Sequence, residues 1–185
     1  MIERIKIAVQ PAVSMDDLDL LAWRDNWDMV DLLTRTPERP REVIYAAGDD
    51  VHVHYIEDYV LGVDYIVLEG ERAAKVAATI RTKLDTLGLD EIVAQLAAAK
   101  DRAQKVQALH VLAAAAPREY DPAVFETITR ALRDSDPEVR FAAALATAYA
   151  EWREFRAPLA DVAMHDTDVV VRREVGLLLD GPEQR

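Results

Sequence analysis

The chain has 185 residues, of which 51% are hydrophobic and 30% charged. This length and hydrophobic content are sufficient for the core of one domain or of two small ones, and they exclude global disorder. It contains no cysteine, which excludes a disulfide scaffold, a cysteine-ligated zinc site and a cysteine nucleophile. The net charge is -12, with 17 acidic and 10 basic residues in 1–88 and 17 and 12 in 89–185. Neither half has the basic surface that a phosphate backbone requires, so we expect no nucleic-acid partner.

No apolar run approaches the roughly 20 residues of a membrane-spanning helix. The N-terminal residues alternate charged and apolar side chains and lack the continuous apolar stretch of a signal peptide. We therefore expect a cytoplasmic protein that does not interact with a membrane.

The N-terminal half begins with a strand pattern and continues with a helix pattern. Ile5, Ile7 and Val9 alternate with less apolar residues, which predicts a half-buried strand. Ser14 and Asp17 then form a start of the capping-box type for a helix predicted over residues 15–33. The helix is expected to end before the prolines of residues 34–40.

The predicted helix over residues 15–33 carries two apolar arcs. The first arc is mostly aliphatic and consists of Leu18, Ala22, Met29 and Leu33. The second arc includes two tryptophans and consists of Leu20, Trp23, Trp27 and Val30. A helix that covers one small sheet needs a single arc. We therefore expect the face with Trp23 and Trp27 to be buried against the helical half of the chain or against a second subunit, as in a homo-oligomer.

Three strand-like runs follow at residues 42–46, 51–57 and 64–69. Their connections are too short for parallel crossovers, so they predict an antiparallel meander. A second helix is predicted over residues 71–84, before Gly88. Residues 1–88 thus predict a small domain with the order β-α-β-β-β-α.

From residue 89 onward the strand signal is absent. Segments rich in alanine, leucine and valine predict six helices, or about three pairs, at residues 91–99, 104–116, 122–134, 137–150, 156–165 and 169–179. The whole chain is therefore predicted to be α+β, with an all-α domain over residues 89–185.

Two turns between these helices repeat at a spacing of 32 residues, from Asp134 to Asp166. Residues 134–140 read Asp-Ser-Asp-Pro-Glu-Val-Arg, and residues 166–172 read Asp-Thr-Asp-Val-Val-Val-Arg. Asp136 is placed to cap a helix, and Pro137 suits the first turn of that helix. A two-helix unit with this period predicts a helical solenoid. The first unit lacks the Asp-Pro turn but has Lys105 at the position of Arg140.

Residues 134–148, DSDPEVRFAAALATA, resemble the inner part of a HEAT repeat, and the resemblance covers the C-terminal half of the chain. The resemblance implies that Arg140 and Arg172 pair with aspartates of adjacent turns and that their role is structural. It also implies a protein-interaction module without catalytic activity, because stacked helix pairs expose an extended concave surface.

The candidate partner-binding residues lie on and just after the helix predicted over residues 137–150. Phe141, Leu145 and Tyr149 recur every four residues and form a stripe, and Trp152 and Arg153 would extend it. If the stripe is exposed, we predict that it anchors a protein partner. If it packs against the flanking helix pairs, it belongs to the core and the binding face lies elsewhere.

Other function classes remain as alternatives. One is an acidic protein of the immunity or antitoxin type that neutralises a basic partner, an idea that rests on size and charge. Another is an enzyme of the HEAT-like DNA glycosylase type, which needs a basic channel, or of the phycobilin lyase type, for which no tetrapyrrole site is recognisable. We expect no enzyme and no cofactor, because there is no glycine-rich phosphate loop and the two serines, Ser14 and Ser135, occupy capping positions.

A metal site is also not expected. His52 and His54 lie two residues apart on one face of a predicted strand, but a zinc site needs three or four converging ligands. The pair is interpreted as part of an exposed strand face.

Overall fold

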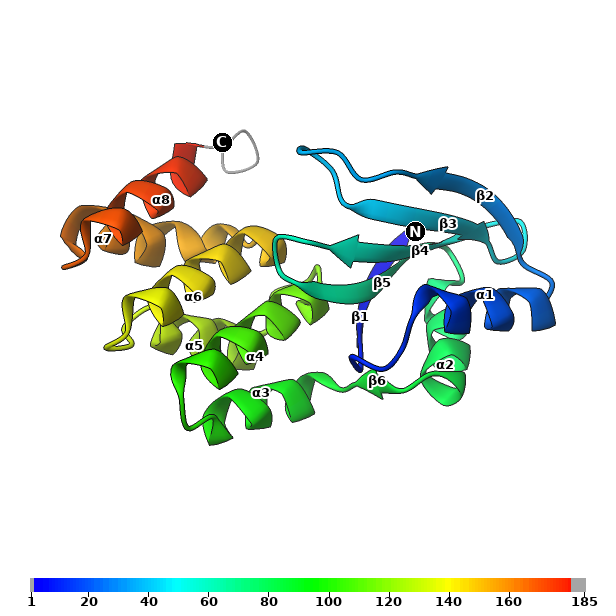
Figure 1. Ribbon diagram of the computed structural model, residues 1–185, viewed down its shortest axis with the longest axis horizontal. Helices are drawn as coiled ribbons and strands as arrows, with labels where there is room; N and C mark the ends of the chain where they lie inside the picture. The colour runs from blue at the N-terminus through cyan, green and yellow to red at the C-terminus, as the bar shows by residue number, and fades with distance from the viewer. Residues whose placement is uncertain (1, 181–185) are drawn as a thin grey trace. The chain divides into compact units, whose positions relative to one another are not determined.

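The computed structural model describes residues 2–180, and the chain divides into two compact units, Met1–Gly88 and Leu89–Arg185 (Figure 1). Within the described residues, the first unit holds all six strands and the second holds helices only. The predicted α+β class is confirmed. No helix in residues 2–180 is long and apolar enough to cross a membrane.

The strands of the first unit form one antiparallel sheet with the order β2-β3-β4-β5-β1-β6. Their bounds are β1 (Glu3–Val9), β2 (Asp28–Leu33), β3 (Arg41–Ala46), β4 (Val51–Asp58), β5 (Val63–Gly70) and β6 (Thr86–Leu87). The predicted strand at the N-terminus and the predicted meander, which is β3, β4 and β5, are confirmed. The two-residue strand β6 was not predicted, because so short a segment has no measurable periodicity.

Two helices of the first unit, α1 (Met15–Arg24) and α2 (Ala73–Lys83), contribute to the same core as the sheet. From the helices the buried side chains are Leu18, Leu21, Ala22, Ala73, Ala77 and Ile80. The strands contribute every second residue, including Val43 and Tyr45 of β3 and Val53 and Tyr55 of β4. The predicted capping box of α1 is confirmed, since the backbone amide of Ser14 donates to the Asp17 carboxylate at 2.8 Å.

The single helix predicted over residues 15–33 is wrong. Helix α1 ends at Arg24, and residues 28–33 form the edge strand β2. Asn26 lies in the left-handed region with φ 54°, and the amide of Trp27 donates to the Ala22 carbonyl at 2.8 Å. This is the Schellman arrangement, which closes a helix and which asparagine adopts more readily than most residues.

The end of α1 also corrects the predicted face with Trp23 and Trp27. Trp23 is on the helix and 77% exposed, whereas Trp27 follows the helix and packs, half-buried, against the core of the same unit. The two indoles therefore do not form one helical arc. Met29, Val30 and Leu32, predicted on the same helix, are exposed on β2.

The second unit consists of consecutive helices, as predicted. These are α3 (Leu89–Ala98), α4 (Arg102–Ala115), α5 (Pro122–Ala131), α6 (Pro137–Ala150), α7 (Arg156–His165) and α8 (Val169–Asp180), with a 3-10 turn at Arg153–Phe155. Contacts within the pairs α3–α4, α5–α6 and α7–α8 are joined by contacts from α4 to α6 and from α6 to α8 (Figure 1). Helix α6 is thus the central helix of the array.

An aspartate immediately precedes each of the helices α4, α6 and α8 and caps its N-terminus. The carboxylates of Asp101, Asp136 and Asp168 accept backbone amides of the first turn at 2.8–2.9 Å. Such caps satisfy amides that have no partner within the helix. Because the helix starts are determined locally, α6 occupies the range that the sequence predicts.

Candidate functional site

The predicted partner-binding stripe lies on the least buried arc of α6. Most of the helix is buried, including the alanines at positions 142–144, 146 and 150. Phe141, Leu145 and Tyr149 are half-buried, and only Glu138 of this helix is exposed. The arc of α6 that retains contact with solvent is therefore mainly apolar and aromatic. Whether it binds a partner stays a prediction.

Trp152 does not extend an exposed patch. Its side chain is 4% exposed, and its indole N–H lies 3.1 Å from the carbonyl oxygens of both Pro117 and Arg118. The indole is stacked on Phe155, with ring centroids 5.6 Å apart and an interplanar angle of 5°. Trp152 is a core residue because its apolar rings and its single donor both find partners inside the unit.

The aromatic cluster around Trp152 has four members, Tyr120, Phe125, Trp152 and Phe155. Centroids of contacting rings are 4.9–5.6 Å apart, within the range of favourable aromatic pairs. Arg153, by contrast, is exposed and its guanidinium contacts the neighbouring Glu154. Of the five predicted binding residues, the structure thus keeps three on one arc, buries Trp152 and leaves Arg153 on the surface.

The repeated turns carry a network of ion pairs that links successive helix pairs. Arg140 binds Asp166 through two hydrogen bonds of 2.7 Å and also donates to the carbonyl oxygens of Asp134 and Ser135. One unit earlier, the Lys105 ammonium lies 2.6 Å from the Asp134 carboxylate. The expected pairing of Arg140 with an aspartate of the adjacent turn is confirmed. Arg172 instead donates to the Asp166 carbonyl, within its own turn.

The ion-pair network lowers the pKa of Asp166. The hydrogen bonds from Arg140 hold the pKa of Asp166 below its usual value of 3.8, and the amide of Asp168 contributes in the same direction. A lowered folded-state pKa contributes stability that is present above the unfolded pKa and is lost as the pH falls through the folded value.

We expect the contribution of Asp166 to appear when unfolding of the native chain and of Asp166→Asn is compared by urea titration between about pH 7 and about pH 2. The native chain is more stable above pH 4, and the difference narrows below it as Asp166 becomes protonated. A constant difference across the range would contradict the assigned ion pair.

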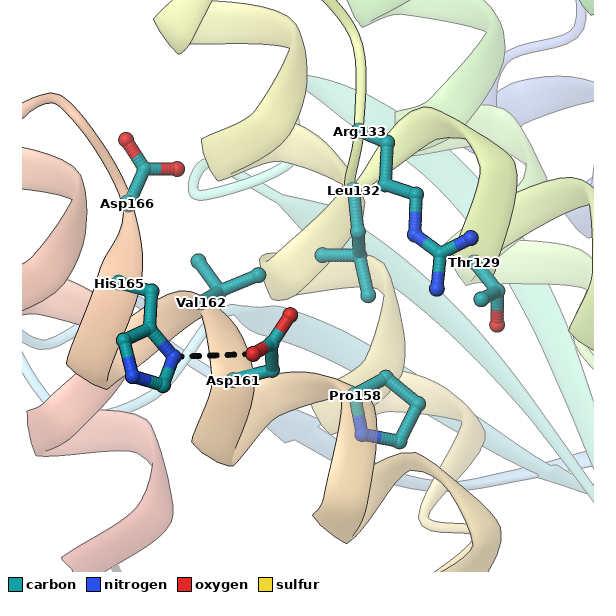
Figure 2. A pocket seen from close by; sticks show the side chains of 8 residues that line it. All are labelled: Thr129, Leu132, Arg133, Pro158, Asp161, Val162, His165 and Asp166. Carbon is teal, nitrogen blue, oxygen red and sulfur yellow. Dashed lines mark hydrogen bonds and ion pairs between the residues drawn. The ribbon is translucent and has the colours of Figure 1, made fainter.

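A small cavity lies between α5 and α7 (Figure 2). Its volume is about 140 Å³, and its lining includes Thr129 from α5 and Asp161 and His165 from α7. Figure 2 shows the hydrogen bond of 3.0 Å that joins His165 Nδ1 to the Asp161 carboxylate. Both side chains are mostly exposed and four residues apart on one helix. The cavity is smaller than the roughly 300 Å³ of a ligand pocket, and the pair is typical of a helix surface.

The two histidines considered for metal binding lie in the first unit. Their ring centroids are 6.4 Å apart, and His54 Nδ1 is 2.5 Å from a Glu42 carboxylate oxygen. Within residues 2–180, no three histidine, aspartate or glutamate side chains come together in a way that could hold a metal ion.

Two carboxyl groups with raised pKa values, Asp19 and Asp64, were not predicted from the sequence. Burial raises the pKa of Asp64 in β5, while its hydrogen bond with Tyr55 acts in the opposite direction. The Tyr55 hydroxyl lies 3.0 Å from this carboxylate and 3.1 Å from the Val13 carbonyl. The Tyr55 hydroxyl therefore links β4 and β5 to the loop before α1. The contact of Asp64 with Tyr55 on the neighbouring strand is not visible in the local sequence, where Asp64 lies two positions after the loop residue Gly62.

Comparison with protein-family models, with curated proteins and with solved structures finds no match for this chain.

Proposed function

We propose that this chain is a cytoplasmic protein-interaction module without catalytic activity, and that its partner contacts a HEAT-like array through Phe141, Leu145 and Tyr149 of α6. The observation that carries the proposal is the composition of the outward arc of this helix. A helix arc that faces water is normally polar. Here the arc has one charged side chain, Glu138, at its start, and an apolar stripe along the rest.

The position of α6 also supports this proposal. The helix lies between α4 and α8, so a partner on its outward arc is also adjacent to the second helices of both neighbouring pairs. Phenylalanine and tyrosine supply large contact areas at low entropic cost, and residues of this kind dominate binding energies at protein interfaces. The neighbouring alanines are small and buried, which leaves the stripe as the most prominent feature of the helix.

An acidic protein that neutralises a basic partner is the second candidate, and the net charge of -12 is the observation that favours it. This function uses the same kind of contact with added electrostatic attraction, which mainly increases the association rate and is weakened by salt. A strong decrease of affinity between about 50 mM and about 500 mM salt would favour it over a contact dominated by the apolar stripe.

The test begins by identifying partners through affinity capture from the source cell and mass spectrometry, followed by calorimetry with the purified partner. We expect the double variant Phe141→Ser/Tyr149→Ser to weaken binding by about 100-fold or more, since two central aromatic side chains are removed. Because these side chains are half-buried, the loss of stability should stay below the roughly 3–5 kcal/mol of a fully buried aromatic residue.

The matched control is Phe141→Leu/Tyr149→Phe, which keeps the apolar surface and should retain binding. Unchanged affinity of the folded serine variant would show that the partner binds elsewhere. A loss of stability as large as that of a core residue would place the stripe in the core, and the proposal would then fail.

A further inference from the structure

The ion pairs between successive turns define a series of three basic residues, Lys105, Arg140 and Arg172, which occupy the same position in α4, α6 and α8. Lys105 binds Asp134 in the next turn, and Arg140 binds Asp166 in the turn after that. Arg172 makes the equivalent backbone contact in its own turn. Its positive charge also helps to lower the pKa of Asp166, but within residues 2–180 Arg172 forms no salt bridge of the kind that Lys105 and Arg140 form.

The face of α6 that carries Arg140 is buried. Arg140, Ala144 and Thr147 follow one another at helical spacing, all three are buried, and Arg140 contacts the turn that begins α8. The corresponding positions of α8 are Arg172, Gly176 and Leu179, which are only half-buried. A Cβ atom added at Gly176 would have no atom within 4 Å apart from its chain neighbours and the backbone of its own helix. Within residues 2–180, this face of α8 is therefore partly exposed, whereas the equivalent face of α6 is buried.

The last helix pair is also unusually apolar on its surface. Met164, Val169, Val170 and Leu177 are each between 54% and 66% exposed. Helix α8 is in addition neutral, with two arginines and two acidic residues, in a chain with a net charge of -12. The helix itself therefore adds no net charge repulsion to a contact between two copies of the chain.

Helix α8 is complementary to itself. Arg172, Gly176 and Asp180 are spaced four residues apart and so lie along one face. If a second α8 packs antiparallel with its Gly176 opposite Gly176, each Arg172 faces the Asp180 of the other copy. The glycines allow a close approach of the two backbones at the centre. Of the exposed apolar residues, Val169 lies three positions before Arg172 on this face and would be removed from water in the contact.

We propose that two copies of this chain associate through α8, with Arg172 of each copy paired to Asp180 of the other. A head-to-tail contact between copies would provide fewer ion pairs for the same face of α8. In such a contact Arg172 would lie against the turn between α3 and α4 of the next copy. The position in that turn that corresponds to Asp134 and Asp166 is Ala99, which cannot form an ion pair. The two-fold arrangement gives Arg172 a carboxylate for a direct salt bridge and is independent of the proposed partner site on α6.

One helix from each copy buries less surface than the roughly 1,200 Å² of a stable interface, so the dimer is concentration-dependent. Sedimentation equilibrium of the full chain from about 1 µM to about 1 mM is the measurement, since these concentrations span weak association. We expect monomer at the low end and dimer at the high end.

Three variants test the contact. Asp180→Arg and Arg172→Glu each place like charges opposite one another, and we expect each alone to be monomeric across the range. Mixed in equal amounts, the two variants restore opposite charges in both pairs, so a heterodimer should form. Asp161→Arg makes the same change of charge on α7, outside the proposed contact, and should leave the dimer intact.

The variant Gly176→Gln distinguishes an effect on the dimer contact from an effect on the stability of the fold. Glutamine favours a helix more than glycine, and the site has room for its Cβ, so the melting temperature should not fall. Its side chain would prevent close approach of the two helices, and we expect the dimer to weaken by about tenfold or more.

Three results would overturn the proposal. The first is a chain that stays monomeric at the highest concentration, and the second is a dimer that forms unchanged in Asp180→Arg and Gly176→Gln. The third is a dimer that is lost in Trp23→Ser but not in these variants, which would assign the interface to the first unit.

Discussion

Replacing Arg140 by methionine is expected to lower the free energy of unfolding by about 3–5 kcal/mol, because it leaves a buried carboxylate without its partner. The Asp166 side chain is 3% exposed and that of Arg140 is 10% exposed. Methionine keeps most of the apolar stem but provides no donor. Three partners are lost at once, namely the Asp166 carboxylate and the carbonyl oxygens of Asp134 and Ser135.

Urea denaturation followed by circular dichroism measures the loss. Arg172→Met is the matched control and should cost about 1 kcal/mol, since this arginine donates to the Asp166 carbonyl and forms no salt bridge within residues 2–180. Equal losses in the two variants would contradict the importance of the Arg140–Asp166 pair.

Trp152→Ala is expected to destabilise the protein by about 3–5 kcal/mol, as for other fully buried aromatic side chains. The substitution removes the ring that is stacked on Phe155 and contacts Tyr120, and it opens a cavity among the remaining aromatic rings. The carbonyl oxygens of Pro117 and Arg118 lose the indole donor in the same step.

Trp152→Phe separates the two contributions, since phenylalanine retains most of the packing and lacks only the donor and part of the ring. We expect it to cost about 1–2 kcal/mol, measured by thermal and urea unfolding. If Trp152→Ala instead unfolded like the native chain and lost only partner binding, Trp152 would belong to an interaction surface and not to the core.

The most accurate predictions from the sequence concern features that short segments determine. Asp136 and Pro137 set the start of α6, and the predicted range 137–150 is the observed one. The pairing of Arg140 with an aspartate of the adjacent turn was expected from the resemblance of the repeated turn to HEAT repeats, and Arg140 pairs with Asp166. In both cases, the residues that decide the structure are close together in the sequence or repeated within it.

The predictions that failed depend on contacts between distant residues or on a single backbone conformation. Helical periodicity continues past Arg24, so only the left-handed Asn26 separates α1 from β2. Trp152 is buried because its donor reaches Pro117 and Arg118, more than thirty positions earlier, and its ring meets Tyr120. No local pattern distinguishes such a tryptophan from one on an exposed patch.

The position of β1 in the sheet affects the order of events during synthesis of the chain. This strand lies between β5 and β6, both of which follow it by a long interval, and Glu3 is paired with Gly70. The β3–β4–β5 meander can form from segments that are adjacent in the sequence before β1 pairs with β5 and β6. Closing such a long loop is slow compared with forming a hairpin or a helix pair. Although β1 is synthesised before both of its partner strands, it is therefore among the last strands of this sheet to pair, and until then the edge of β5 is open to pairing with other chains.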